Sequence, residues 1–166
     1  MDTTIVQRAA LGSLDGGQAY MTFEDAVAEF PVEHFNTRPF NLEYSFWHLL
    51  EHIRICNRDI LDYIQSATYH ELEFPNDLWP DRGDNTDEEG WGRTLAEIRQ
   101  DMASLRALVA DGKSDLAELA LNAGGDSKPT LLREVLVIAD HNAYHLGEFS
   151  ILRHLLNLWP ASHDAV

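Results

Sequence analysis

Residues Ala139–Phe149 read A-D-H-N-A-Y-H-L-G-E-F and lie inside an apolar run from Leu131 to Leu158 that contains no proline. The run predicts one long helix, because an internal proline would break the helical hydrogen bonding. His141 and His145 are four residues apart, so a helix places them one turn apart on one face. Two imidazoles with this spacing can occupy neighbouring positions on one metal ion. The pair alone is a weak indication, since such pairs also occur as ordinary core or surface residues.

A second apolar stretch that contains histidines lies upstream, at Phe46–Tyr63, and carries His48 and His52. Its apolar residues repeat at the spacing of one helical face. Asn41 is a plausible N-cap, so the pattern predicts a helix from there to about Gln65, roughly 24 residues or about 36 Å long. A helix of this length is typical of a bundle. The presence of two helices with histidines strengthens the metal interpretation.

Four further segments have helical patterns. Asp2–Leu14 is a modest candidate, and Phe23–Phe30 is a short one that ends at a proline. The segment Thr94–Glu97 reads T-L-A-E, a capping-box pattern that predicts the start of another long helix, with Gly112 as its C-terminal stop. Asp115–Leu121 is a second short candidate.

These patterns amount to four long helices and two short ones, with no hairpin signal and no alternating strand pattern. The sequence therefore predicts a single all-α domain over residues 1–166, most simply a four-helix bundle. Bundles often build metal sites from side chains on facing helices.

The stretch 67–90 has no helical pattern and is long for a connection in a compact domain. Loops of this length are usually functional or mobile. Its aromatic residues Tyr69, Phe74 and Trp79 suggest that part of it folds back onto the bundle. Simple packing against the edge of the bundle is the plainer interpretation.

Composition excludes several classes of partner. The chain has 166 residues, 45% of them hydrophobic, and a net charge of −16. Such acidity argues against binding to nucleic acid or to an anionic membrane surface. The N-terminus does not resemble a signal peptide, and no uncharged apolar stretch is long enough to span a membrane, so we expect a cytoplasmic protein. Cys56 is the only cysteine, which excludes an intrachain disulfide.

Two motifs resemble those of the DinB family of small helical metalloproteins. This superfamily includes the YfiT-type thiol transferases and the mycothiol-dependent maleylpyruvate isomerases. Residues 44–54 read Y-S-F-W-H-L-L-E-H-I-R, similar to the family pattern x-x-L-L-x-H-I that follows an aromatic residue. Residues 140–148 read D-H-N-A-Y-H-L-G-E, close to the family signature H-N-x-x-H-x-G-[QE]. With the order of the helices, the resemblance covers nearly the whole chain.

The resemblance implies a bundle of unusual connectivity, in which two parallel neighbouring helices are joined by a long crossover. It also implies a divalent metal ion held by three histidines, which here correspond to His52, His141 and His145. It further suggests a homodimer. Some thiol-dependent members have a carboxylate at the position of His141, so the resemblance supports the site better than it supports any particular substrate.

Three neutral imidazoles with an open coordination position resemble a catalytic zinc site, and nickel also accepts imidazole ligands. We therefore expect a metal-dependent transferase that activates a low-molecular-weight thiol for attack on an electrophilic small-molecule substrate. Two alternatives remain open. One is a metal-dependent hydrolase that uses metal-bound hydroxide, and the other is a non-enzymatic metal-binding stress or structural protein.

Both His48 and His52 lie on the second long helix, so either could be the third ligand. At about 100° per residue, His52 lies about 120° from the centre of the apolar stripe and His48 about 160°. His48 is therefore expected nearer to solvent. The family ligand is the histidine that follows the L-L-x triplet, which here is His52.

Other polar residues flank the expected ligands. Cys56 follows His52 by one turn and could line the site or bind a soft metal, although core packing is the plainer interpretation. Asp140, Asn142, Glu148 and Glu51 are candidates to accept the second N–H of a metal-bound histidine. Each of them, taken alone, is more simply interpreted as a surface residue.

Overall fold

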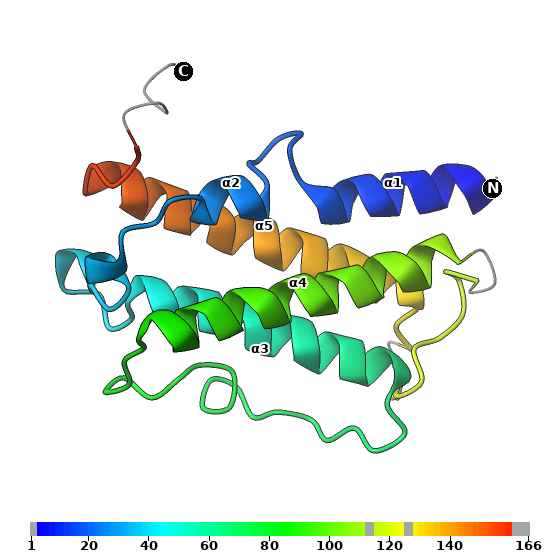
Figure 1. Cartoon of the computed structure of the whole chain (residues 1–166). Coiled ribbons are helices and arrows are strands. Elements are labelled where there is room, and N and C mark those ends of the chain that lie inside the picture. The colour runs from blue at the N-terminus through cyan, green and yellow to red at the C-terminus, as the bar shows by residue number, and fades with distance from the viewer. Residues whose placement is uncertain (1–2, 112–114, 125–127, 161–166) are drawn as a thin grey trace.

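Four long helices and one short one form the bundle of the computed structural model (Figure 1), which describes residues 3–111, 115–124 and 128–160. The helices are α1 (Thr3–Asp15), α2 (Phe23–Val27), α3 (Phe46–Gln65), α4 (Glu88–Ala110) and α5 (Leu131–Leu155). Two 3-10 turns, η1 (Val32–His34) and η2 (Pro39–Asn41), lie between α2 and α3. Within the described ranges the only β-type pairing is an isolated bridge between Leu119 and Thr130. The predicted all-α bundle is confirmed.

The connectivity is the one that the family resemblance implies. α3 and α4 lie side by side and run in the same direction, joined by the long crossover of residues 66–87 (Figure 1). α1 and α5 run in the opposite direction (Figure 1). No described helix is long and apolar enough to cross a membrane.

Two predicted helix starts were misplaced. The N-cap of α3 is Ser45 rather than Asn41, because the Ser45 hydroxyl accepts the backbone N–H of His48, whereas Asn41 adopts a φ of 62° in η2. The N-cap of α4 is Asp87, whose carboxylate accepts the N–H of Gly90 at 2.8 Å. Thr94 lies inside α4 instead of capping it.

The second predicted short helix is also absent. Residues 115–121 form turns and the bridge to Thr130 instead of a helix, and the backbone N–H of Leu121 donates to the carbonyl of Ile64 at the end of α3. Tertiary pairing has therefore overridden a weak local helical pattern. The predicted stop at Gly112 lies outside the described residues. α5 ends at Leu155, three residues before the predicted end.

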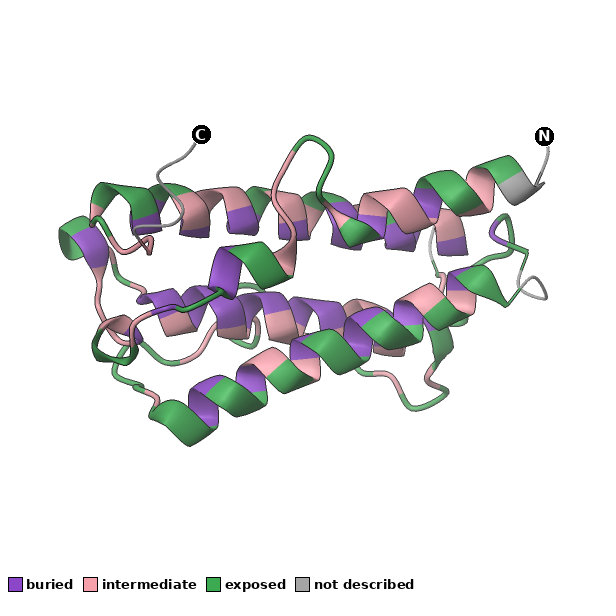
Figure 2. Cartoon of the chain, turned by 45° about the horizontal axis from the view of Figure 1, so that its top comes forward, coloured by how far each residue is buried: buried purple, intermediate pink, exposed green. Residues whose placement is uncertain are grey.

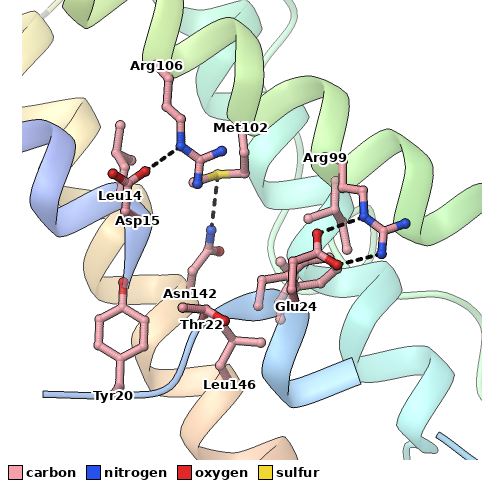
Figure 3. Close-up of a pocket in the computed structure, with 13 residues that line it drawn as sticks. Leu14, Asp15, Tyr20, Thr22, Glu24, Arg99, Met102, Arg106, Asn142 and Leu146 are labelled. Carbon is pink, nitrogen blue, oxygen red and sulfur yellow. Dashed lines mark hydrogen bonds and ion pairs between the residues drawn. The ribbon is translucent and has the colours of Figure 1, made fainter. Parts of the chain in front are cut away.

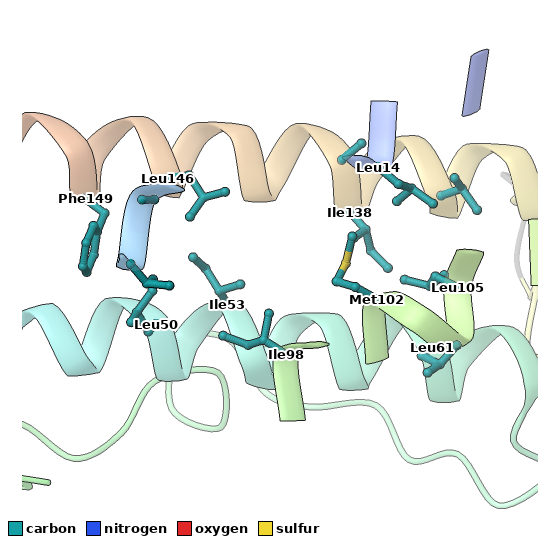
Figure 4. Packing of buried hydrophobic residues seen from close by; sticks show 14 of the residues in the cluster. Leu14, Leu50, Ile53, Leu61, Ile98, Met102, Leu105, Ile138, Leu146 and Phe149 are labelled. Atoms are coloured by element: carbon teal, nitrogen blue, oxygen red, sulfur yellow. The ribbon is translucent and has the colours of Figure 1, made fainter. Parts of the chain in front are cut away.

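The core is built from the apolar face of each long helix. The buried residues of every long helix lie along one side, which faces the other helices (Figure 2). At the centre, the side chains of α3, α4 and α5 interdigitate (Figure 4); among them are Leu50, Ile53, Leu61, Ile98, Met102, Leu105, Ile138, Leu146 and Phe149. Full burial of one such side chain contributes about 1.5–3 kcal/mol. This shared core holds α3 and α5 at a fixed distance.

One buried charge joins α2 to the C-terminal end of α5. Arg153 is 0% exposed, and its guanidinium donates to the carbonyls of Ala26 at 2.8 Å, Ala28 at 2.7 Å and Leu158 at 3.2 Å. It also lies 4.0 Å from the ring centroid of Trp159. The guanidinium is thus fully partnered by carbonyl oxygens and an aromatic face, as a buried cation requires.

Replacing Arg153 with methionine is expected to destabilise the fold by about 2–4 kcal/mol, because three carbonyls lose a charged donor. Chemical unfolding followed by circular dichroism measures the change. Arg93→Met is the control, since Arg93 is 65% exposed and its ion pair with Glu89 spans 3.9 Å. The control should change stability by less than about 0.5 kcal/mol. Equal effects of the two substitutions would contradict the role assigned to Arg153.

Candidate metal centre

Three histidines meet where α3 packs against α5. His52 comes from α3, and His141 and His145 come from successive turns of α5. Their ligand nitrogens all lie within 4.8 Å of one another, and the Nε2 atoms of His52 and His141 are 3.1 Å apart. His52 and His145 are buried and His141 is half-buried. The structure therefore brings together the three residues that the sequence predicts.

The spacing of the nitrogens suits a single ion. For Zn–N bonds of about 2.05 Å, two ligand nitrogens lie about 3.3 Å apart at a tetrahedral angle and about 2.9 Å apart at a right angle. The 3.1 Å between His52 and His141 falls between these values. Because all three nitrogens lie within 4.8 Å, modest side-chain adjustments place His145 on the same ion. The donor set fits a divalent transition metal such as zinc or nickel.

The outer nitrogens of two histidines are held by acceptors. Nδ1 of His52 donates to the carbonyl of Leu78 at 2.7 Å, and Nδ1 of His145 donates to Oε2 of Glu148 at 3.1 Å. Because a carbonyl can only accept, Nδ1 of His52 carries the proton and Nε2 keeps its lone pair. This outer hydrogen bonding is the usual way in which proteins orient metal-binding histidines. Nδ1 of His141 is buried, and hydrogen bonding from the Asn142 side chain acts on the His141 ring against the effect of burial.

The electrostatics of the centre favour a cation. Burial lowers the pKa of both His52 and His141 to about 4, so both rings are neutral at pH 7 and able to bind a metal. Burial alone would raise the pKa of the Glu148 carboxyl, but hydrogen bonds from His145 and Tyr44 outweigh it and lower that pKa. A carboxylate therefore lies beside the imidazole rings of the centre, and its charge attracts a positive ion.

The crossover of residues 66–87 covers the centre. The Trp79 ring stacks on the His52 ring with centroids 3.8 Å apart and an interplanar angle of 6°. The Leu78 carbonyl of the same segment accepts a hydrogen bond from His52. These two contacts show that part of the crossover folds back onto the bundle and touches the centre. Simple packing against the edge of the bundle does not explain them. Phe74, by contrast, is 75% exposed.

His48 does not join the cluster, and its predicted position near solvent is wrong. The side chain is only 1% exposed. Nδ1 of His48 accepts from the Ser45 hydroxyl at 2.7 Å, and Nε2 donates to the Asp81 carbonyl at 3.0 Å. The prediction used only the angle between His48 and the apolar stripe of α3. The crossover buries a second face of that helix, which this angle does not take into account. His48 therefore anchors the crossover.

The other flanking residues divide into contacts with the centre and residues that point away from it. Glu148 contacts His145, whereas Asp140 is exposed. Sγ of Cys56 lies 3.6 Å from Nδ1 of His52, but burial raises the pKa of the thiol to about 12, so it stays protonated at neutral pH. Asn142 is buried and donates to Sδ of Met102, and its side chain also interacts with the His141 ring. Glu51 is likewise turned away and pairs with Arg54 on α3.

Sequence reasoning missed Tyr44. Its hydroxyl donates to Glu148, so it joins the segment that precedes α3 to the carboxylate that orients His145. An open cavity of about 540 Å³ adjoins this contact and is lined by Tyr44 and Trp79 among others. Tyr44 is the first residue of the 44–54 motif, and this position was the only indication of its role in the sequence. A single aromatic residue before a helix does not reveal which distant side chain it will contact.

Comparison with known families gives one match. Residues 17–149 match the family model described as DinB superfamily, a range that includes both histidine motifs. Comparison with curated proteins gave no match, and neither did comparison with solved structures.

Replacing His52 with alanine should remove bound metal or weaken its binding by a large factor, because one of three ligands is lost. His48→Ala should leave occupancy near one ion per chain, since the ring nitrogens of His48 bond to Ser45 and Asp81 and not to the centre. Elemental analysis after incubation with zinc or nickel measures both. Equal losses in the two variants would indicate a four-histidine site, and wild-type protein that stays metal-free when offered both metals would exclude the centre.

Proposed function

We propose that this chain, which belongs to the DinB superfamily, is a metal-dependent transferase that joins a low-molecular-weight thiol to an electrophilic small molecule. One observation carries the proposal: three histidine side chains converge, and Trp79, which stacks on His52, also lines an open cavity. Among the described residues the cluster contains three potential ligands and no fourth. A site of this kind leaves room for an exchangeable ligand, whereas structural zinc sites are closed by four protein ligands.

When bound, a zinc or nickel ion would supply a position at which a thiol loses its proton at neutral pH. In the transfer, the S–H bond breaks and its proton goes to solvent. A bond then forms between sulfur and the electrophilic carbon, and the leaving group departs with its electron pair. The thiol has to come from outside the chain, because Cys56 is buried and stays protonated.

The side chains around the centre have distinct tasks in this proposal. Glu148 holds His145 by its Nδ1 proton, and Tyr44 holds Glu148. Trp79 covers His52 and, with Tyr44, gives the adjoining cavity aromatic walls. Aromatic walls suit an apolar or aromatic electrophile, since they bury its surface and stack on its ring. Glu148 and Tyr44 are thus positioning residues.

We also propose that the protein is a homodimer that pairs through α5. Val135, Leu146 and Phe149 are buried, as expected for the core face of this helix. The opposite side carries large apolar side chains that are 44–72% exposed: Leu136, Tyr144, Ile151 and Leu155. An exposed apolar stripe of this kind favours association with another surface.

Wild-type protein loaded with metal should catalyse thiol-dependent consumption of a halo-aromatic or an epoxide, screened against bacillithiol, mycothiol, glutathione and coenzyme A. Glu148→Gln should lower activity by about 10–100-fold, the usual effect of losing a partner that orients a metal-bound histidine. Asp140→Asn is the matched control, because Asp140 is an exposed carboxylate on the same helix and should keep nearly full activity. Turnover that survives complete metal removal, or that needs no thiol, would reject the mechanism; metal-dependent turnover without thiol would point to a hydrolase.

Light scattering at concentrations on the order of tens of micromolar should give the mass of a dimer. Changing Tyr144 and Ile151 together to lysine should shift it to the monomer, because two desolvated charges would then oppose association. Leu121→Lys alters a residue that is 60% exposed away from α5 and should leave the dimer intact. A monomeric mass for the wild type would exclude the dimer.

A further inference from the structure

The open cavity of about 540 Å³ that Trp79 lines has walls rich in rings. Tyr44, Trp79, Pro75 and Pro80 all belong to its lining. The rings of Tyr44 and Trp79 are neighbours, with centroids 5.5 Å apart and an interplanar angle of 39°. Both residues are only partly buried, so part of their surface stays open to a ligand.

Carboxylates outnumber cations in this lining. Glu43 and Asp81 are acidic, and Arg82 is the one cation among the described residues that line the cavity. Arg82 pairs with Glu43, whereas no ion pair of Asp81 occurs in the described part of the chain. Burial lowers the pKa of His48, which also lines the cavity, so its ring is neutral at pH 7. Arg38 lies outside the lining and donates to two backbone carbonyls of the crossover. The lining therefore carries a net negative charge.

A second cavity shows a different balance of charge (Figure 3). Its volume is about 120 Å³, and its lining comes from α1, α3, α4, α5 and the region around α2. Arg99 pairs with Glu24 and Arg106 pairs with Asp15, so two cations meet two carboxylates. The Phe23 ring in its wall already has the Arg99 guanidinium 5.8 Å from its centroid. The charges of this second cavity are thus matched within the protein, whereas those of the larger cavity are not.

Aromatic rings and excess carboxylates together favour a positively charged ligand in the larger cavity. The face of an aromatic ring is negative, so it attracts cations, and tryptophan and tyrosine do so best. The Tyr44 hydroxyl donates to the Glu148 carboxylate, which polarises the phenol and makes its ring richer in electrons. An anion, by contrast, would meet the lining carboxylates and a net protein charge of −16.

The hydrogen-bonding groups of the wall indicate which kind of cation fits. The backbone carbonyl of Asp81 already accepts from His48 at 3.0 Å, and the Tyr44 hydroxyl is bonded to Glu148. An ammonium group with N–H bonds is strongly hydrated and needs acceptors to replace its water. A quaternary ammonium has no N–H bonds, and its methyl groups pack directly against rings.

We propose that the larger cavity binds a small organic cation that carries a methylated ammonium group. The methyl groups contact the rings of Tyr44 and Trp79, and the charge is balanced by Asp81 and Glu43. The inference deepens the proposed function by naming the charge of a substrate, and it rests on that function only in taking this cavity for a substrate site.

The test measures binding of choline to full-length, metal-free protein, so it does not depend on turnover. The chain has four tryptophans, and their ¹⁵N-labelled indole groups give a simple NMR spectrum in which Trp79→Leu identifies the Trp79 signal. Choline should shift that signal in a saturable way and leave the signal of buried Trp91 unchanged. The neutral carbon analogue of choline, with a tert-butyl group in place of the trimethylammonium group, should bind about 10-fold more weakly. Ethanolamine, which keeps the charge but lacks the methyl groups, should also bind more weakly than choline.

Variants separate the contributions of charge and ring. Asp81→Asn removes one negative charge with little change in size and should weaken choline binding about 5-fold. Glu118→Gln is the matched control, because Glu118 is exposed and belongs to the segment bonded to the C-terminal end of α3, remote from the cavity. Trp79→Leu should remove the preference for choline over its carbon analogue, measured by saturation transfer to the ligand methyl protons. Phe40→Leu, which alters an exposed ring outside the lining, should keep that preference. Circular dichroism verifies that each variant is folded.

Three results would overturn the proposal. The first is a Trp79 signal that choline does not shift. The second is wild-type protein that binds the carbon analogue or ethanolamine as tightly as choline. The third is an unchanged preference for choline in folded Trp79→Leu, or, if that variant fails to fold, equal choline affinities of Asp81→Asn and Glu118→Gln. Each of these results would leave thiol transfer to a neutral electrophile standing, whereas choline binding without any thiol-dependent turnover would contradict only the transferase proposal.

Discussion

The hydrogen bond from Nδ1 of His52 to the carbonyl of Leu78, 2.7 Å long, joins the bundle to the crossover and prepares the candidate centre at the same time. It fixes the proton on Nδ1, so Nε2 points its lone pair toward His141. It also places Trp79 flat against the imidazole ring. A buried imidazole that lacked this partner would carry an unsatisfied donor, so the crossover and the histidine stabilise each other. His48 repeats the arrangement one turn earlier with Asp81.

The long helices and the histidine cluster follow from the periodicity of the sequence. His141 and His145 are close because a helix brings residues four apart together, and His52 faces them because the apolar faces of α3 and α5 share one core. These are regular geometric consequences that need no knowledge of the loops. The same periodicity puts Val135 in the core and Tyr144 on the exposed side of α5.

What could not be predicted comes from contacts between segments that are distant in the sequence. His48 is buried only because residues 66–87 return across α3, and Tyr44 finds its partner 104 positions away. Thr94 looks like a helix cap, yet its hydroxyl donates to Glu51 of α3 at 2.7 Å inside α4. Local patterns cannot distinguish a cap from an interhelical donor, because both use the same hydroxyl group.

The parallel arrangement of α3 and α4 has a consequence for the backbone dipoles. Each helix carries a partial positive charge at its N-terminus and a negative one at its C-terminus, so two parallel neighbours place like partial charges together. α1 and α5 run the other way, which leaves two dipoles in each direction (Figure 1). Side chains reinforce the balance: Glu88 and Glu89 lie in the first turn of α4, and Arg153 and His154 lie in the last turn of α5. The two helices that run the other way thus offset part of the dipole field that the parallel pair creates.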